Sequence, residues 1–186
     1  MSSPTLINKT IPENLLREPL EYLFADHVRL HAFCQAIGEV AVELESGPLS
    51  APEQTDNLRA ILNYLRDELP RHIADEEIDI IPRLKLRAKP EDHIEQILDQ
   101  IRHEHSKDES LTDTLIDELD RLAKGVMPEN TQGLIHVARH FAETHCRHLR
   151  WENDTLLPLA RKRLTREDQK QIGRTMARRR GVPFPD

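Results

Sequence analysis

The chain has 186 residues, of which 32% are charged and only 4% aromatic, and its net charge at pH 7 is -7. This length allows one domain with a substantial apolar core, and the composition favours helices over sheets. The acidic balance argues against a nucleic-acid-binding protein. Because the sequence has neither a run of about 20 apolar residues nor a signal-peptide core, we expect a cytoplasmic protein without a membrane partner.

Loop-forming residues divide the chain into four segments of roughly 30 residues each. Proline, glycine and polar residues cluster at 47–53, where 50–53 has the pattern of a capping box, at 89–92 and at 124–130. Within each segment, apolar side chains recur at alternating steps of three and four, which places them on one face of a helix. A short final helix is expected to start at Thr165 and to end near Gly181.

These elements predict an all-α fold, an up-down-up-down antiparallel four-helix bundle with a short C-terminal helix. We expect an N-terminal arm over residues 1–14, the bundle over 15–160, and a basic helix and tail over 161–186, whose arginines are typical of a solvated helix end. Pro70 falls inside the second helix and should cause a kink or bulge there. The inward face of the fourth helix is the least regular, and its predicted members are Val137, Phe141, Thr144, His148, Glu152, Thr155 and Leu159.

One eleven-residue pattern occurs twice, as HIADEEIDIIP from His72 and as HLRWENDTLLP from His148. Both copies have a glutamate four residues after the histidine and a proline ten residues after it. Each of the four predicted inward faces also carries a histidine where a leucine would be expected. The repeat is therefore a helical hairpin, with a lone histidine on its first helix and His-x-x-x-Glu on its second. Two such hairpins would bring all the polar groups to one level of the core.

Burying these imidazoles and carboxylates without partners would cost several kcal/mol per group, and bound cations would remove most of that cost. The set is too large for one tetrahedral zinc ion and suits two first-row ions with the glutamates bridging, for which iron is the natural candidate. The predicted metal ligands are His27, His72, Glu76, His105, His148 and Glu152.

The sequence leaves open the roles of other polar residues near this pattern. His31, Glu77 and Glu109 stay open as additional ligands, as supporting groups or as surface residues. His145 is expected to be a surface or supporting group, and His103 to be solvated. The two cysteines, Cys34 and Cys146, lack CxxC spacing and are interpreted as small buried side chains in a reducing compartment, neither bridged nor metal-binding.

As a set, these motifs resemble the haemerythrin-like, HHE cation-binding family over roughly residues 15 to 160. The motifs that carry the resemblance are His27, His72-x-x-x-Glu76-Glu77 with Pro82, Glu104-His105, and His148-x-x-x-Glu152 with Pro158. The ending from Met176 to Val182 also resembles the short helix that follows the bundle in bacterial members. The resemblance implies a non-haem di-iron site whose two iron ions are bridged by the two glutamates and by an oxo or hydroxo group.

The chain differs from the oxygen-carrying members of this family, which use five histidines. Those proteins have His-x-x-x-His on the third helix, where this chain has His105 and Glu109, and His-x-x-x-x-Asp on the fourth, where it has His148 and Glu152. The set is thus richer in carboxylates, which favours the ferric state. A ferritin-like site is disfavoured, because its mark is Glu-x-x-His and no histidine here has a glutamate three residues before it.

Three functions are compatible with these residues. The first is a di-iron protein that binds or senses dioxygen or another small diatomic molecule, or that handles iron. The second is an enzyme that acts on peroxide or nitric oxide, or that donates iron for the repair of iron-sulfur clusters. The third is a structural cation site, which predicts a colourless zinc protein that unfolds with a chelator. The sequence indicates neither a physiological ligand nor an obvious oligomer interface.

Overall fold

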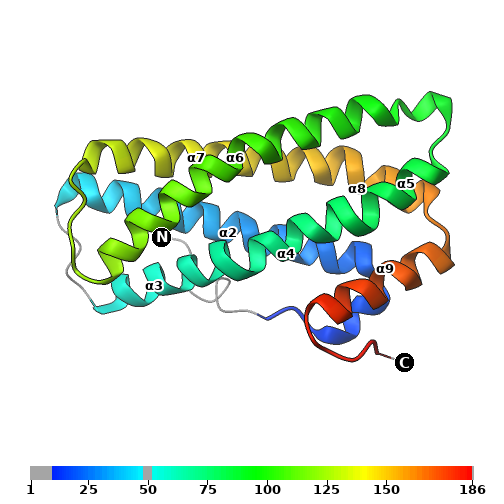
Figure 1. The fold of residues 1–186 in the computed structure, drawn as a ribbon, viewed down its shortest axis with the longest axis horizontal. Helices are drawn as coiled ribbons and strands as arrows, with labels where there is room; N and C mark the ends of the chain where they lie inside the picture. The colour runs from blue at the N-terminus through cyan, green and yellow to red at the C-terminus, as the bar shows by residue number, and fades with distance from the viewer. Residues whose placement is uncertain (1–9, 48–51, 186) are drawn as a thin grey trace.

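The structure, a computed structural model, describes residues 10–47 and 52–185, and their side chains except those of 52–53 and 106–110. Within these ranges every regular element is a helix. Figure 1 shows long helical runs side by side and a shorter helix, α9, at one end of the bundle. The capping box predicted at 50–53 lies outside the described residues. In the described part of the chain, no helix is both long enough and apolar enough to cross a lipid bilayer.

The first run is α2 (Pro19–Ser46), preceded by the short helix η1 (Glu13–Arg17). The second run consists of α3 (Pro52–Asn63), η2 (Tyr64–Glu68), α4 (Leu69–Ala74), η3 (Asp75–Ile80) and α5 (Ile81–Arg87). After the short turn η4 (Pro90–Asp92) comes the third run, α6 (Ile94–Ala123). The fourth consists of α7 (Thr131–Trp151), η5 (Glu152–Leu156) and α8 (Leu157–Arg163), and the chain continues into α9 (Arg166–Arg179).

Three segments inside the second and fourth runs, η2, η3 and η5, are π-helical. Each is followed, after one residue, by a proline: Pro70, Pro82 and Pro158. A proline in a helix has no N–H to donate and its ring clashes with the carbonyl four residues earlier. In all three places that carbonyl lies within the π segment, whose wider turn accommodates the ring. The bulge predicted at Pro70 is confirmed.

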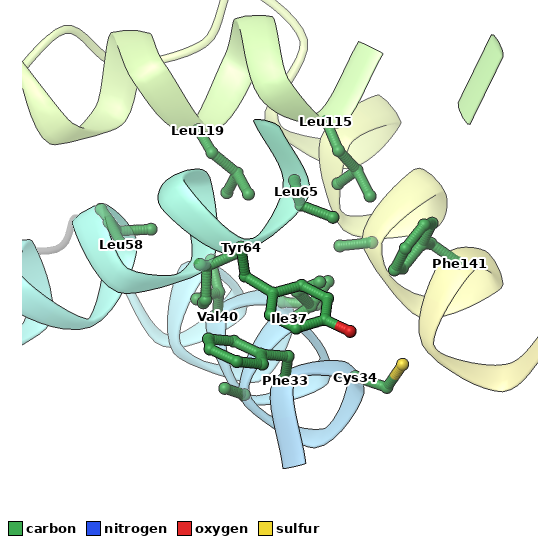
Figure 2. Close-up of a cluster of buried hydrophobic side chains, with 14 of the residues drawn as sticks. Phe33, Cys34, Ile37, Val40, Leu58, Tyr64, Leu65, Leu115, Leu119 and Phe141 are labelled. Atoms are coloured by element: carbon green, nitrogen blue, oxygen red, sulfur yellow. The ribbon is translucent and has the colours of Figure 1, made fainter. Parts of the chain in front are cut away.

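The buried apolar side chains form two clusters, one on either side of a polar layer. The larger core, at the end of the bundle that holds the start of α3 and of α7, packs residues such as Ile37, Tyr64 and Phe141, and Figure 2 shows its centre, where the Phe33 ring stacks on that of Tyr64. The smaller core joins α2, α5, α8 and α9. In every run the predicted histidine falls between residues of the two cores, so the interruption in the apolar pattern lies at one level.

Helix α9 packs tightly against the end of the bundle that holds the smaller core. A β-carbon on Gly173 would lie 2.1 Å from the backbone oxygen of Leu16, so only glycine permits this approach of α9 to η1. The helix start predicted at Thr165 is confirmed. A capping box closes it, in which the Thr165 hydroxyl accepts from the backbone N–H of Asp168 and the Asp168 carboxylate accepts from that of Thr165. The interpretation of the C-terminal arginines as a solvated helix end is wrong for Arg179 and Arg180, which are partly buried.

Those two arginines neutralise a pair of buried aspartates on η3. Arg180 donates from Nη2 to one Asp75 oxygen at 2.6 Å and from Nη1 to the other at 3.1 Å. Arg179 donates to Asp79 at 2.7 Å and also contacts Asp75. Both carboxylates are almost completely buried, with exposures of 0% for Asp75 and 2% for Asp79. The basic C-terminal helix therefore clamps the π segment that carries Glu76.

Candidate metal centre

The six residues predicted as metal ligands meet between the two cores. They form two groups of four that share Glu76 and Glu152: one adds His27 and His72, the other His105 and His148. In each group the potential ligand atoms all lie within 4.8 Å of one another. The two glutamates thus stand between two histidine pairs, in the positions that bridging carboxylates would need.

The distances show that the ring Nε2 atoms face the carboxylates. His27 Nε2 lies 3.5 Å from an oxygen of Glu76 and 3.5 Å from one of Glu152. On the same side, His72 Nε2 is 3.7 Å from Glu76. On the other side, Nε2 of His105 is 3.6 Å from Glu76 and Nε2 of His148 is 3.0 Å from Glu152. These two histidine nitrogens are 3.2 Å apart.

On each of the four histidines, the opposite ring nitrogen, Nδ1, is hydrogen-bonded to an oxygen on a different run. His27 pairs with the Asn153 amide oxygen at 2.7 Å and His72 with the Asp26 carboxylate at 3.1 Å. An Nδ1–H that donates to such an oxygen fixes the tautomer, so that the Nε2 lone pair points to the centre.

The other two histidines follow the same rule. His105 Nδ1 pairs with Glu77 at 2.7 Å, and His148 Nδ1 pairs with Glu104 at 2.5 Å. Each of these supporting side chains is the sequence neighbour of a predicted ligand. In every case, however, it holds the histidine of the next run: α2 supports the second run, the second supports α6, α6 supports α7, and η5 supports α2. The four hydrogen bonds therefore close a ring around the centre.

Inside this ring, buried polar atoms remain without hydrogen-bond partners. Among the described side chains they include Nε2 of His27 and of His72 and both carboxylate oxygens of Glu76 and of Glu152. Leaving such atoms unsatisfied costs about 1–3 kcal/mol each, and more where the group is charged. Nitrogen and carboxylate donors that converge on one buried point are the chemistry of a first-row transition-metal site. The residues present therefore fit two metal cations.

Charge within the metal-free cluster is set by the glutamates. Burial lowers the pKa of His72, but Glu76 and Asp26 outweigh it and raise that pKa to about 10. Burial likewise opposes protonation of His148, while Glu152 and Glu76 raise its pKa to about 9. Burial would raise the pKa of Glu76, but the nearby histidines hold it well below its usual range. Without metal, the carboxylates therefore favour the protonated form of His72 and His148.

The structure distinguishes between the residues whose roles the sequence left open. Glu77 supports His105 through its Nδ1 and belongs to neither four-residue group. His31 is partly exposed and also lies outside both groups, while the side chain of Glu109 lies outside the described part. His103 is exposed, as predicted.

His145 lies in the interior, which makes the surface alternative wrong. Its side chain has 4% exposure, and its ring stacks on Phe141 with centroids 4.0 Å apart. It lines a cavity of about 640 Å³ together with His72, His105 and His148. Apolar side chains of α2, of the second run and of α6 form much of the remaining wall, among them Leu30, Leu65, Leu69, Ile73 and Ile116.

The supporting residues Asp26, Asn153 and Glu104 are functional candidates that sequence reasoning did not assign as partners of the histidines. The sequence does contain a signal for them, because each is a polar residue directly adjacent to a predicted ligand. This adjacency does not show which histidine each side chain contacts, however, since that depends on how the helical runs pack against one another.

Comparisons with known proteins agree with this geometry. The family model described as the hemerythrin HHE cation binding domain matches residues 18–160. An uncharacterized protein of Haemophilus influenzae is 26% identical over 166 residues, which cover 89% of this chain and 91% of that protein. No solved structure matches the chain. The sequence resemblance to this family is confirmed, and the chain belongs to the hemerythrin HHE cation-binding domain family.

Proposed function

We propose that the protein binds two iron ions in this centre and uses them to bind or sense dioxygen or another small diatomic molecule. The observation that carries the proposal is the pair of donor groups that share two buried glutamates with unsatisfied oxygens. His27 and His72 would hold one ion, His105 and His148 the other, and both glutamates would bridge. The scaffold that we infer is the up-down-up-down antiparallel four-helix bundle, because the ring of supporting hydrogen bonds links each run to the next.

Iron bound there would supply a redox-active centre that can take up a diatomic ligand. The chain's own residues control what reaches it. The cavity lies beside His72 of one pair and beside both histidines of the other, and the apolar side chains that form much of its wall suit a small uncharged molecule. The ring of Nδ1 partners keeps the imidazoles in one orientation whether or not a ligand is present. A role in iron handling would use the same six residues.

An alternative is an enzyme that acts on peroxide or nitric oxide, and His145 is the observation that favours it. Burial and the neighbouring His148 lower the pKa of His145 to about 3, so this imidazole is neutral in the cavity at physiological pH. A neutral imidazole can donate a hydrogen bond to a polar reactant or accept one from it. Turnover of peroxide or nitric oxide well above that of free iron, lost in His145→Phe, would support the enzyme. A reversible adduct without turnover would support the binding protein.

Metal content and an optical spectrum of protein from iron-supplied cells test the proposal. We expect about two irons per chain and the near-ultraviolet absorption of a coupled ferric pair. His72→Ala and His148→Ala should each lower the iron content, while the exposed His103→Ala should leave it unchanged. Equal losses in all three variants, or a colourless protein that holds only zinc, would refute the di-iron assignment.

A further inference from the structure

Helix α2 runs antiparallel to α7 and its continuation η5 in a constant register. At the metal centre, His27 lies opposite Asn153, with its Nδ1 hydrogen-bonded to the amide oxygen. Three turns further along α2, a β-carbon placed on Gly38 would lie 3.8 Å from the β-carbon of Ala142. In both pairs, His27 with Asn153 and Gly38 with Ala142, the two residue numbers add up to the same value. The two helices therefore keep the same antiparallel register over this stretch, and they approach closely at Gly38.

Cys34 and Cys146 occupy this same register, one turn from Gly38 and Ala142 in the direction of the metal centre. A hydrogen bond joins the side chains of Cys34 and Cys146, and neither cysteine is in a disulfide. A disulfide requires β-carbons about 3.5–4.5 Å apart. The β-carbons at Gly38 and Ala142, one turn further along the interface, would be 3.8 Å apart, so the two helices approach this closely beside the cysteines. The hydrogen-bonded Cys34 and Cys146 therefore lie next to a close approach of the two helices.

The two thiols differ in their access to solvent. Cys34 is completely buried in the larger core (Figure 2), whereas Cys146 packs against that core and is partly exposed. A reagent from solvent therefore reaches Cys146 first, and Cys34 stands behind it. The chain contains only these two cysteines. From this placement we propose that Cys34 and Cys146 are a redox pair, which a hydroperoxide converts into an intramolecular disulfide that joins α2 to α7.

The chemistry requires a hydroperoxide and no other reagent. The Cys146 sulfur attacks one oxygen of the O–O bond, which breaks to give a sulfenic acid and water, or an alcohol from an organic hydroperoxide. Cys34 Sγ then attacks the Cys146 sulfur, the S–O bond breaks, and a water molecule leaves as the S–S bond forms. The two sulfurs lose two electrons in total, and the O–O bond takes them up. The two thiol protons leave in the products.

The disulfide would fasten together the two helices that carry His27 and His148. Cys34 follows His27 by two helical turns, and Cys146 lies about half a turn before His148. The bond would fix the spacing of the runs beside the metal centre. Because this disulfide forms without a metal, a test of the redox pair gives a result that does not depend on the proposed di-iron function.

Counting thiols in the full chain tests the proposal. The reduced protein is treated with hydrogen peroxide, the remaining thiols are alkylated, and intact masses are measured. We expect the mass of the monomer to fall by about 2 Da, no thiol to remain for alkylation, and a protease digest to contain the linked pair of peptides. Two alkylatable thiols after treatment, or a gain of oxygen mass in place of the loss, would overturn the proposal.

Serine variants supply the matched control. Cys146→Ser, at the partly exposed position, should show no loss of two hydrogens and should keep Cys34 available for alkylation once the protein is unfolded. Cys34→Ser should stop at an oxidised Cys146 that carries added oxygen or joins a second chain. A mass loss of about 2 Da in either variant would show that the signal does not come from this pair. The wild-type measurement decides the proposal even if one variant fails to fold.

Discussion

Replacing Arg180 by methionine should destabilise the protein markedly, because Arg180 joins α9 to η3 through hydrogen bonds to the buried Asp75. Methionine keeps much of the length and apolar bulk of the side chain but removes the guanidinium. Asp75, which has no solvent exposure, would lose two hydrogen bonds, of 2.6 and 3.1 Å. The hydroxyl of Tyr22 would lose a third, which it now accepts from Arg180 Nε at 2.9 Å.

The size of the effect follows from the burial of the pair. Removing one partner of a buried ion pair costs about 3–5 kcal/mol. Two features place Arg180→Met at the low end. Arg179 still contacts Asp75, and burial raises the pKa of Asp75 even with both arginines present, so the carboxyl can take up a proton when one is lost. We therefore expect about 3 kcal/mol, which for a domain of this size lowers the melting temperature by about 6–12 °C.

Urea unfolding of the metal-free protein, followed by circular dichroism, measures this free energy without a contribution from metal binding. Arg178→Met is the matched control, since Arg178 is exposed on the same helix and its loss should cost no more than about 0.5 kcal/mol. In an Asp75→Asn background, Arg180→Met should cost clearly less, because the buried charge has already been removed. Equal costs for Arg180→Met and Arg178→Met would refute the clamp.

Three further predictions concern the metal centre. The pKa of His72, lowered by burial but raised by the glutamate one turn later, is about 10 when folded against 6.5 unfolded. The contribution of His72 to stability is therefore complete below pH 6.5 and is lost as the pH rises through 10. Urea titrations should show that the free energy of unfolding of the metal-free protein falls over this pH window, and that the free energy of unfolding of the metal-loaded protein falls less. Asn153→Ala removes the Nδ1 partner of His27 and should weaken iron binding by about 10–100-fold in a chelator competition, and an unchanged affinity would contradict the role of the supporting ring. Ile116→Trp should fill part of the cavity and slow the binding of nitric oxide to the iron-loaded protein at unchanged iron content, whereas the exposed Val42→Trp should not.

The sequence predicts which histidines and glutamates gather in the interior, because the signal is local. A histidine among leucines at helical spacing marks a polar position on an inward face, whatever that face packs against. In the first helix all the apolar positions of the predicted face, from Leu16 to Leu44, are buried, and so is His27. The level at which the runs meet also follows, because the repeated hairpin places its polar residues at matching heights.

The predicted inward face of the fourth run differs from the fully buried face at several positions, for two reasons. Before the metal centre, steps of three and four fit more than one helical phase. The structure buries Ala138 and His145 fully, while Val137, which packs against the larger core, and Thr144 are only partly buried. After Glu152, the π segment adds a residue to the turn, so a constant helical period no longer holds.

The effect of that extra residue is visible beyond the centre. The buried face resumes at Leu156, Leu157 and Ala160, while the predicted Thr155 and Leu159 remain partly exposed. The supporting ring and the arginine clamp could not be predicted either, because each joins residues whose contact depends on the packing of separate runs.

The eleven-residue repeat encodes a backbone distortion as well as two ligands. In each copy the glutamate lies at or next to the start of a π segment, and the closing proline comes two residues after its end. An uninterrupted α-helix would set the carbonyl of Ile78 or of Asp154 against the proline ring. The wider turn that avoids this clash falls between the glutamate and the proline. The histidine and glutamate can therefore keep the four-residue spacing that turns both toward the centre, while the helix beyond them rotates to bury a new apolar face. A motif with the same histidine and glutamate but no proline would lack the local reason for that wider turn, so the proline shapes the site as much as those two residues do.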